Sequence, residues 1–308
     1  MHKTVLLLGA TGKIGTHAAE AFWNSGWRIR RFDRTIDRLT EAAMGCDVIV
    51  NGFNPPAYQN WAQNIPRITD EVIEAATQSG ATIIVPGNVY NYGTTQGEWS
   101  EKTVQNPCTR KGQIRKDMEQ TYREAANRGV QTIILRGGDF IDPNQDATLM
   151  AMVVMKDLKK GKITTLGDPD VVRAYCYLPD WASAAVALAE KRSELSMFED
   201  VPFCNVHFSS RLLLNALEAQ LNHPLKLQAF PWWLMRIASP FWGLAYEMLE
   251  MRYLFETDHR LSGAKLRTLL PDYRSTDLQT ILAAEIPADA FSREIKVQGH
   301  STSTQTNL

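Results

Sequence analysis

The sequence has few of the residues that build disulfide frameworks or metal sites. Its 308 residues include only four cysteines, and no two of them form a CxxC pair. A disulfide scaffold or zinc knuckle is therefore not expected, and we predict buried thiols in a reducing, cytoplasmic protein. The six histidines show no metal-ligand spacing, so we expect no metal. The cysteines are Cys46, Cys108, Cys176 and Cys204.

The chain also lacks a strong net charge and a long uninterrupted apolar run. A formal net charge of -1 gives no general attraction to nucleic acid or to anionic membranes, which leaves only local patches for such contacts. The N-terminal apolar run is too short for a signal peptide. The most apolar stretch, residues 230–255, is interrupted by Pro231, Arg236 and Pro240, so no membrane span is expected. Its tryptophans 232, 233 and 242 fit a core, an apolar substrate lid or a homodimer surface.

Short apolar strands alternate with helical segments through the first half of the chain. This alternation predicts an α/β fold with a doubly wound parallel sheet covered on both faces. After about residue 150 the rhythm loosens, with helices expected near 147–160 and 181–192 and a strand near 201–208. Residues 1–150 are therefore expected to form the main domain. A smaller lobe is expected over 151–295, with elements returning to the sheet, followed by a polar tail at 296–308.

A glycine-rich turn, GATGKIG, joins the first predicted strand to the first predicted helix. Bare glycine backbone lets a pyrophosphate approach the amide groups, and the helix offers its positive N-terminus to the anion. Gly9 and Gly12 would hold the phosphates, and Gly15 would let the helix pack on the sheet. A glycine turn without a ligand is the alternative. The residues of this loop expected at a dinucleotide are Gly9, Thr11, Gly12, Lys13, Ile14 and Gly15.

An acidic residue follows the second predicted strand, at the distance expected for a group that binds ribose. Asp33 would accept hydrogen bonds from a ribose diol and repel a 2′-phosphate, which favours NAD over NADP. Arg34 would stack on adenine or pair with a 2′-phosphate, so NADP stays open. A solvated strand edge is the alternative interpretation of the arginines here.

Six segments occur in a characteristic order: the GxxGxxG loop, VIVNGF (48–53), IIVPGNVYNYG (83–93), RKGQIRKDME (110–119), ILRGGDFIDP (134–143) and YLPDWASAAVALAE (177–190). This set resembles the extended and atypical short-chain dehydrogenase/reductase superfamily, which includes NAD-dependent epimerase/dehydratase proteins and NmrA-like proteins. The resemblance implies a Rossmann fold. It also implies that Asn51, Gly52 and Phe53 line the cofactor.

The stretch from Arg34 to Asp47 is shorter than this superfamily normally has. It has room for one helix but not for the helix and third strand expected there. That strand would lie at a sheet edge, so we predict that it is missing and that the adenine pocket is open.

The catalytic YxxxK motif of the superfamily is also absent. Alignment on Glu119 puts Lys111 at the tyrosine and Arg115 at the lysine, four residues apart on one helix face. The resemblance makes both catalytic candidates, whereas a solvated basic helix face is the alternative. Asn88 takes the place of the family serine, and Tyr90 or Tyr92 could supply the missing phenol unless both simply pack at a strand end.

Three functions follow from these features. The favoured one is an NAD(P)-dependent oxidoreductase or epimerase-like enzyme that acts on a small hydroxyl- or carbonyl-bearing substrate. The missing YxxxK motivates the alternative, a non-enzymatic NAD(P) sensor of the NmrA-like kind. An epimerase or dehydratase of nucleotide-linked sugars is a third, for which Arg211 and Arg236 are the only candidate diphosphate groups.

Overall fold

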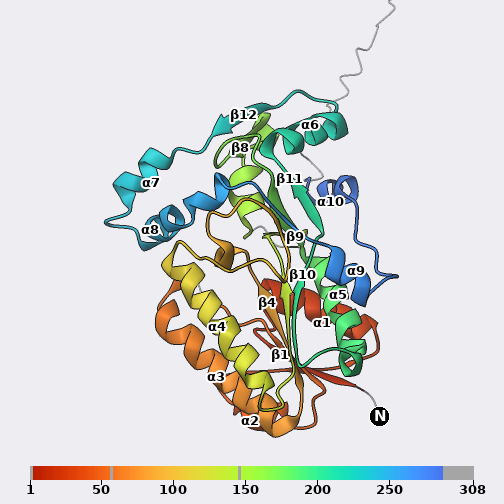
Figure 1. The fold of residues 1–308 in the computed structure, drawn as a ribbon. Helices are drawn as coiled ribbons and strands as arrows, with labels where there is room; N and C mark the ends of the chain where they lie inside the picture. The colour runs from red at the N-terminus through yellow and green to blue at the C-terminus, as the bar shows by residue number, and fades with distance from the viewer. Residues whose placement is uncertain (1–2, 56–57, 145–146, 287–308) are drawn as a thin grey trace, which may run out of the picture.

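The computed structural model describes residues 3–55, 58–144 and 147–286. A six-stranded parallel sheet forms the centre of the molecule, in the order β10-β6-β4-β3-β1-β2 (Figure 1). The predicted doubly wound α/β fold is confirmed. The six strands are β1 (Thr4–Leu8), β2 (Arg28–Arg31), β3 (Val48–Asn51), β4 (Thr82–Gly87), β6 (Thr132–Arg136) and β10 (Phe198–Pro202).

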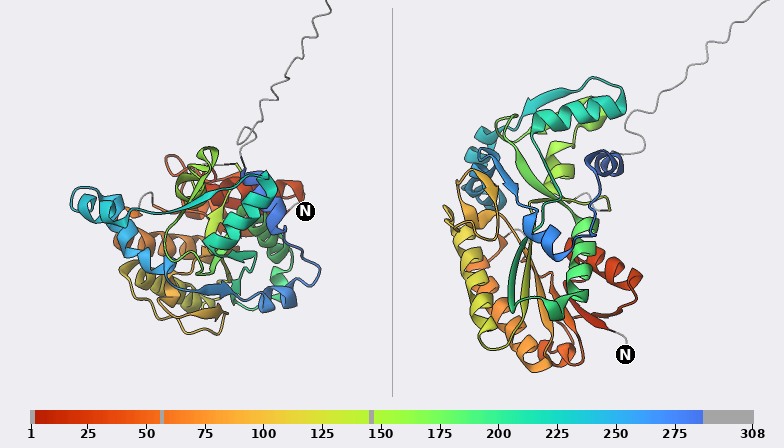
Figure 2. Two further views of the ribbon diagram at one scale, coloured as in Figure 1. Left: turned by 90° about the horizontal axis from the view of Figure 1, so that it is seen from above. Right: turned by 45° about the vertical axis from the view of Figure 1, so that its right-hand side comes forward.

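Helices cover both faces of this sheet (Figures 1 and 2). One face carries α1 (Lys13–Asn24), α5 (Leu178–Glu190) and α9 (Ala264–Leu269). The other carries α2 (Leu39–Ala43), α3 (Trp61–Ser79) and α4 (Arg110–Ala126).

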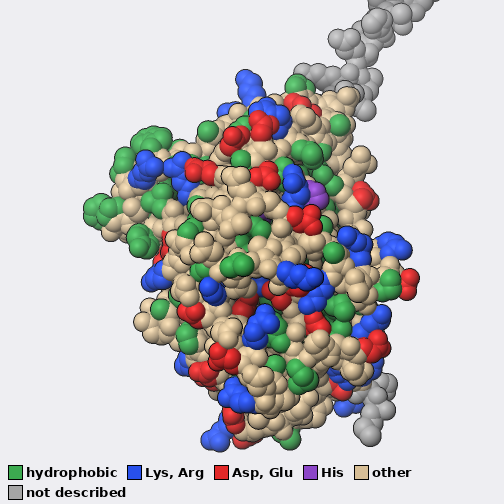
Figure 3. Space-filling view, in the orientation of Figure 1, with side chains coloured by type: hydrophobic (Ala, Val, Ile, Leu, Met, Phe, Trp, Pro, Cys, Tyr) green, Lys and Arg blue, Asp and Glu red, His purple; other side chains and the backbone are tan. Residues whose placement is uncertain are grey.

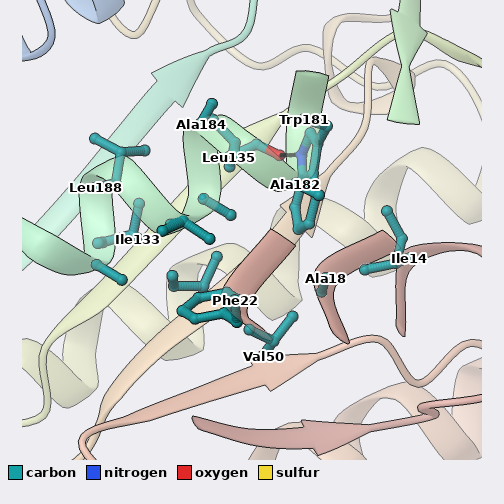
Figure 4. Close-up of a cluster of buried hydrophobic side chains, with 14 of the residues drawn as sticks. Ile14, Ala18, Phe22, Val50, Ile133, Leu135, Trp181, Ala182, Ala184 and Leu188 are labelled. Carbon is teal, nitrogen blue, oxygen red and sulfur yellow. Dashed lines mark hydrogen bonds between the residues drawn. The ribbon is translucent and has the colours of Figure 1, made fainter. Parts of the chain in front are cut away.

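The inner strands β1, β3, β4 and β6 are largely apolar because both of their faces are buried. In β1, Val5 and Leu7 pack toward α1 and α5, while Leu6 and Leu8 pack toward α3. In the α1–α5 layer the indole of Trp181 donates a hydrogen bond to the carbonyl oxygen of Leu135, 3.0 Å away (Figure 4). This bond satisfies the one polar atom of the side chain inside an apolar cluster.

The sheet ends at β2, as the short stretch after Arg34 predicts. Between β2 and β3 the chain forms only α2, so no further strand follows β2 at this edge of the described chain. The expected loss of the third strand is confirmed.

A smaller lobe lies beyond the carboxyl ends of the strands (Figure 1). Its strands form three small sheets, β11-β9-β7, β12-β8 and β13-β5. The strands are β5 (Gly97–Trp99), β7 (Asp139–Ile141), β8 (Lys162–Thr165), β9 (Arg173–Tyr177), β11 (Val206–Phe208), β12 (Lys226–Ala229) and β13 (His259–Leu261). The helices are α6 (Ser210–Leu221), α7 (Trp232–Ala238), α8 (Gly243–Glu250) and α10 (Leu278–Glu285).

Three expectations about secondary structure and cysteine burial are wrong. Residues 147–160 form a five-residue π-helical segment, Met150–Val154, and a 3₁₀ turn rather than a regular helix. The single strand expected at 201–208 is two strands, because the chain leaves β6 after Pro202 and then pairs with β9. Cys108 is exposed rather than buried, and all four thiols are free.

None of the helices within the described ranges is both long enough and apolar enough to cross a lipid bilayer.

Candidate functional site

The glycine loop has the geometry that its sequence predicts. Gly9 has φ +71, and its carbonyl oxygen accepts a hydrogen bond from Gly12 N at 2.9 Å. A Cβ at Gly15 would overlap that carbonyl oxygen and the Cα of Ala10, so α1 packs on the turn only because Gly15 has no side chain. A Cβ at Gly12 would meet only Gly9 O, at 3.3 Å. The protein itself therefore requires glycine at position 15 much more strictly than at position 12.

The turn also leaves the start of α1 without a side-chain cap. Gly12 is the N-cap residue and the first turn contains no acidic side chain, so the positive end of the helix dipole is not neutralised locally. Thr11 is exposed, Lys13 is half-buried and Ile14 is buried. The loop combines open backbone with an uncompensated helix N-terminus, which suits an anion.

A cavity of about 160 Å³, the inner cavity, lies where β3, β4 and β6 end. It brings together predicted residues from distant parts of the sequence. Ile14, Asn51, Gly52, Phe53, Asn88, Tyr90 and Arg115 all line it.

A second cavity of about 690 Å³, the outer cavity, lies beside the end of β2. It shares Phe53, Asn54 and Ile68 with the inner cavity, so the two adjoin. It is the larger of the two, and its lining comes from the segment between β2 and α2, from the end of β3 and from α3. That it holds adenine stays a prediction.

Asp33 and Arg34, close to the end of β2, have different surroundings. Arg34 lines the outer cavity, with its guanidinium 5.8 Å from the centre of the Phe53 ring. Asp33 is exposed, does not line the cavity, and its Oδ1 accepts hydrogen bonds from Thr35 N and Oγ1 at 2.9 and 2.7 Å. These hydrogen bonds lower the pKa of Asp33.

The end of β3 is held in shape by its own side chains. Asn51 Nδ2 donates to the Tyr122 hydroxyl at 3.1 Å, and Asn51 Oδ1 accepts from Phe53 N at 3.2 Å. A Cβ at Gly52 would lie 2.7 Å from Leu8 O, so this position requires glycine for close strand packing. The three residues form one wall of the inner cavity, next to the glycine loop.

Tyr90 places a phenol at the inner cavity. Its hydroxyl lies 3.4 Å from that of Tyr58, and its backbone N–H donates to Asn88 Oδ1 at 3.1 Å. Burial, followed by the neighbouring Tyr58 and Asp139, raises the pKa of Tyr90 well above its ordinary value. Tyr92, which is fully buried, points elsewhere and stacks on Trp99.

Arg115 places a guanidinium at the same cavity. It lies 4.9 Å from the centre of the Trp61 ring, and its Nε is buried without a hydrogen-bond partner. Burial lowers the pKa of Arg115. A guanidinium cannot act as a base, so this group can bind an oxygen or an anion but cannot remove a proton.

Lys111 is positioned differently from its helix neighbour. It is fully buried and does not line the inner cavity. Its ammonium is ion-paired with Glu247 and, at 2.6 Å, with Glu250 of α8, and it lies 4.7 Å from the Tyr58 ring centre. Burial favours a higher pKa for Glu250, but the Lys111 hydrogen bonds outweigh it and lower that pKa. The solvated basic face considered for Lys111 is therefore wrong.

A buried ionic network behind the cavity was not predicted from the sequence. Arg136 at the end of β6 pairs with Glu119 of α4 and Asp200 of β10, at 2.6 and 2.8 Å. Its Nη1 also donates to Asn88 O at 2.6 Å, which fixes the backbone that carries the predicted site residue. The sequence feature that could have indicated this network is Arg136 itself, a charged residue at the end of the otherwise apolar strand TIILR.

The sequence predicts Asp139 as a turn cap or a substrate contact, and Asp180 as the N-cap of the helix that follows it. Asp139 lines the inner cavity and is ion-paired with Arg173. Asp180 is not the N-cap of α5, because the helix begins at Leu178 and places Asp180 in its first turn. Its carboxylate instead accepts hydrogen bonds from Asn205 and Thr276, which ties the C-terminal segment to α5.

Known structures share this architecture at low sequence identity. MoeE5 in complex with UDP-glucose and NAD matches with a TM-score of 0.72 at 16% identity, over 92% of this chain and 97% of that one. UDP-glucuronic acid 4-epimerase from Bacillus cereus matches with a TM-score of 0.71 at 18% identity, over 92% and 97%. A nucleoside-diphosphate-sugar epimerase from Pseudomonas aeruginosa matches with a TM-score of 0.70 at 16% identity, over 93% and 97%. No curated protein matches this sequence.

The family model of the NAD dependent epimerase/dehydratase family matches residues 5–201. That segment runs from β1 to β10 and contains the glycine loop, both cavities and nearly all of the central sheet. The chain belongs to the NAD dependent epimerase/dehydratase family.

Proposed function

We propose that this protein binds NAD in an extended pose along the carboxyl edge of the sheet and uses it in redox chemistry on a small substrate. The pyrophosphate would lie on the glycine loop, the adenine end in the outer cavity and the nicotinamide end in the inner cavity. The adjoining cavities on either side of Phe53 and Asn54 support this proposal. The space at Gly12 and the uncapped start of α1 suit a pyrophosphate.

When bound, NAD supplies a hydride donor or acceptor at the inner cavity. Tyr90 would then exchange the proton with the substrate oxygen, while the Asn88 amide and Arg115 would orient and stabilise that oxygen. Because burial raises the pKa of Tyr90, its phenol stays protonated at neutral pH. A protonated phenol suits the reduction of a carbonyl, in which the new alkoxide needs a proton.

The size of the inner cavity favours a small substrate. Pockets for drug-sized ligands usually measure about 300–1,000 Å³, and this cavity measures about 160 Å³. The structural neighbours include complexes with UDP-sugars, but the two arginines considered for a diphosphate do not line this cavity. Arg211 pairs with Asp170 on the surface, and Arg236 is exposed on α7.

Replacement of one phenol tests the proposal. Tyr90→Phe should lower kcat for carbonyl reduction about a hundredfold or more, because it removes the proton donor. The Kd for NADH should stay within about threefold, since the phenol lies at the substrate end of the site. Stopped-flow oxidation of NADH with a panel of small aldehydes, ketones and sugars, together with calorimetry, measures both quantities.

Tyr92→Phe is the matched control. It removes a phenol two positions away that does not line the cavity, and its turnover should stay close to that of the native chain. Equal losses in the two variants would contradict a catalytic role for Tyr90.

One observation favours a second function, a non-enzymatic NAD sensor. The residue aligned with the family's catalytic tyrosine, Lys111, is held in an ion pair away from the inner cavity. In that case NADH would bind, no substrate of the panel would turn over, and Tyr90→Phe would have no kinetic effect to measure.

A further inference from the structure

The two helices that project from the smaller lobe carry a cluster of exposed apolar side chains. Phe241 is 93% exposed, Ile237 65% and Trp233 62%. The cluster, named here the α7–α8 surface, consists of Trp233, Leu234, Ile237, Phe241, Trp242 and Tyr246. Soluble monomers rarely expose so many large apolar groups together, so the α7–α8 surface is expected to have a partner.

The α7–α8 surface projects from the body of the protein and is not packed against it. No residue of α7 is buried. The helix is anchored at its first residue, Trp232, whose indole donates to Leu166 O at 2.6 Å and whose ring packs on Phe230 and Phe255. In Figures 1 and 2 the α7–α8 pair projects from the body, and Figure 3 shows apolar side chains gathered on this projection with basic ones beside them.

The chain segment that carries this surface has charged side chains of one sign only. From residue 219 to residue 246 the chain contains no Asp or Glu, while Lys226 and Arg236 are exposed. Glu218 and Glu247 border this stretch, and Glu247 is turned inward to Lys111. This pattern complements an anionic surface, in a chain whose overall net charge is only -1.

The residue types match a lipid interface. Tryptophan and tyrosine, whose rings have an apolar body and a polar edge, are enriched where hydrocarbon meets headgroups. Amphipathic helices that lie in that interface combine Trp, Phe and Leu with Lys or Arg.

A cavity of about 610 Å³ lies between α8 and the start of α3. Trp242 and Glu247 of α8 line it together with Tyr58 and Trp61. Tyr58 and Trp61 also line the inner cavity, so the two cavities lie on either side of these residues. A lipid-docked α8 would place this opening at the membrane surface.

From these observations we propose that the α7–α8 surface docks the protein peripherally on an anionic lipid bilayer. The apolar side chains would enter the headgroup region, and Arg236 would contact lipid phosphates. This proposal does not depend on NAD binding or on catalysis.

Sedimentation of the full chain with vesicles tests it. Vesicles of phosphatidylcholine with phosphatidylglycerol should bind the protein, and vesicles of phosphatidylcholine alone should bind it more weakly. The double variant Trp233→Ser, Phe241→Ser should reduce partitioning about tenfold or more, because two large apolar groups are lost. Arg236→Gln should reduce binding to the anionic vesicles about fivefold and leave binding to the neutral ones unchanged.

Trp23→Ser is the matched control, since Trp23 of α1 is 69% exposed and lies outside the surface. Its partitioning should equal that of the native chain, and circular dichroism melts should show that every variant is folded. The proposal is overturned if the native chain binds neither kind of vesicle. It is also overturned if Trp23→Ser reduces partitioning as much as the double variant does. Light scattering that shows a dimer lost in the double variant, without lipid binding, would assign the surface to a second copy. If the protein binds vesicles only after residues 287–308 are removed, the occupant of the α7–α8 surface is that segment and the proposal is overturned.

Discussion

At the scale of single residues, the glycine loop separates the needs of the fold from those of a ligand. Gly15 is in contact with the backbone of Gly9 and Ala10, whereas Gly12 faces space except for Gly9 O. The same substitution at the two positions should therefore have different consequences.

We predict that Gly12→Ala will retain the fold and lose cofactor affinity. The new methyl would lie 3.3 Å from Gly9 O and require only a small adjustment, so Tm should change little. The Kd for NADH should rise about tenfold or more, because the methyl occupies the space that a pyrophosphate would approach. Calorimetry and thermal melts measure the two quantities.

In the same assays, Gly15→Ala should instead lower the stability of the fold. Its methyl would overlap backbone atoms that cannot move independently, so the fold should be destabilised by about 1–3 kcal/mol. A loop that serves only as a turn would show unchanged NADH binding in Gly12→Ala.

The residue scale also shows where sequence reasoning fails. The sequence correctly predicts that Lys111 and Arg115 share one helix, and it suggests a common role for them. Arg115 lines the inner cavity, but Lys111 pairs with carboxylates of α8, and Glu250 lies 139 positions further along the chain. Helical spacing indicates a shared face, but it cannot reveal which distant element covers each part of that face.

At the scale of elements, the Lys111 ion pairs attach α8 to the start of α4. Lys111 N also donates to Glu250 Oε1 at 3.0 Å, so one glutamate binds both the backbone and the side chain of this residue. This arrangement indicates a clamp between the smaller lobe and the helix that carries Arg115.

We predict that Lys111→Met will weaken the clamp without abolishing turnover. Two partly buried carboxylates would lose their cation, which should lower the free energy of unfolding by about 3 kcal/mol. Turnover measured well below the new Tm should stay within about threefold of the native value. Urea unfolding and NADH oxidation measure these effects.

Lys116→Met is a suitable control on the same helix. Lys116 contacts the backbone carbonyl of Gln105 but no carboxylate, so stability should change by less than about 1 kcal/mol. A loss of turnover in Lys111→Met with unchanged stability would instead assign Lys111 to catalysis.

The elements that the sequence predicts well are those with local signals. The strand–helix alternation through Arg136 follows from apolar runs and from the glycines and caps that end or begin helices. Thr109 is such a cap, since its side-chain oxygen accepts a hydrogen bond from Gly112 N at 3.2 Å. The missing edge strand also follows, since chain length alone limits what can form. The π-helical Met150–Val154 and the division after Pro202 depend on packing in the smaller lobe, which no short window of sequence contains.

At the scale of the whole molecule, distant segments join the two parts. β10 returns from the smaller lobe to the central sheet, and β13 pairs with β5. His259 of β13 stacks on Trp99 of β5, with ring centres 4.4 Å apart, and its Nδ1 donates to Thr257 O at 2.8 Å. This junction contains a buried imidazole that titrates.

The junction should make stability depend on pH. Burial, together with the charge of Arg173, lowers the pKa of His259 from 6.5 to about 4. The hydrogen bond to Thr257 O and the charges of Asp139 and Asp258 oppose this shift but do not outweigh it. The unfolded chain therefore binds the proton more readily between these two values. The stabilisation is fully present above pH 6.5 and is lost as the pH falls toward 4. Between neutral pH and about pH 5 the loss should be about 2 kcal/mol.

Urea unfolding of the native chain and of His259→Gln across this range tests the prediction. The variant should be less stable at neutral pH, since it loses the ring stack, but its stability should fall less steeply on acidification. The difference in slope isolates His259, because carboxylates that titrate lower contribute equally to both proteins. Parallel slopes would mean that His259 already takes up a proton in the folded state, and that other groups govern acid unfolding.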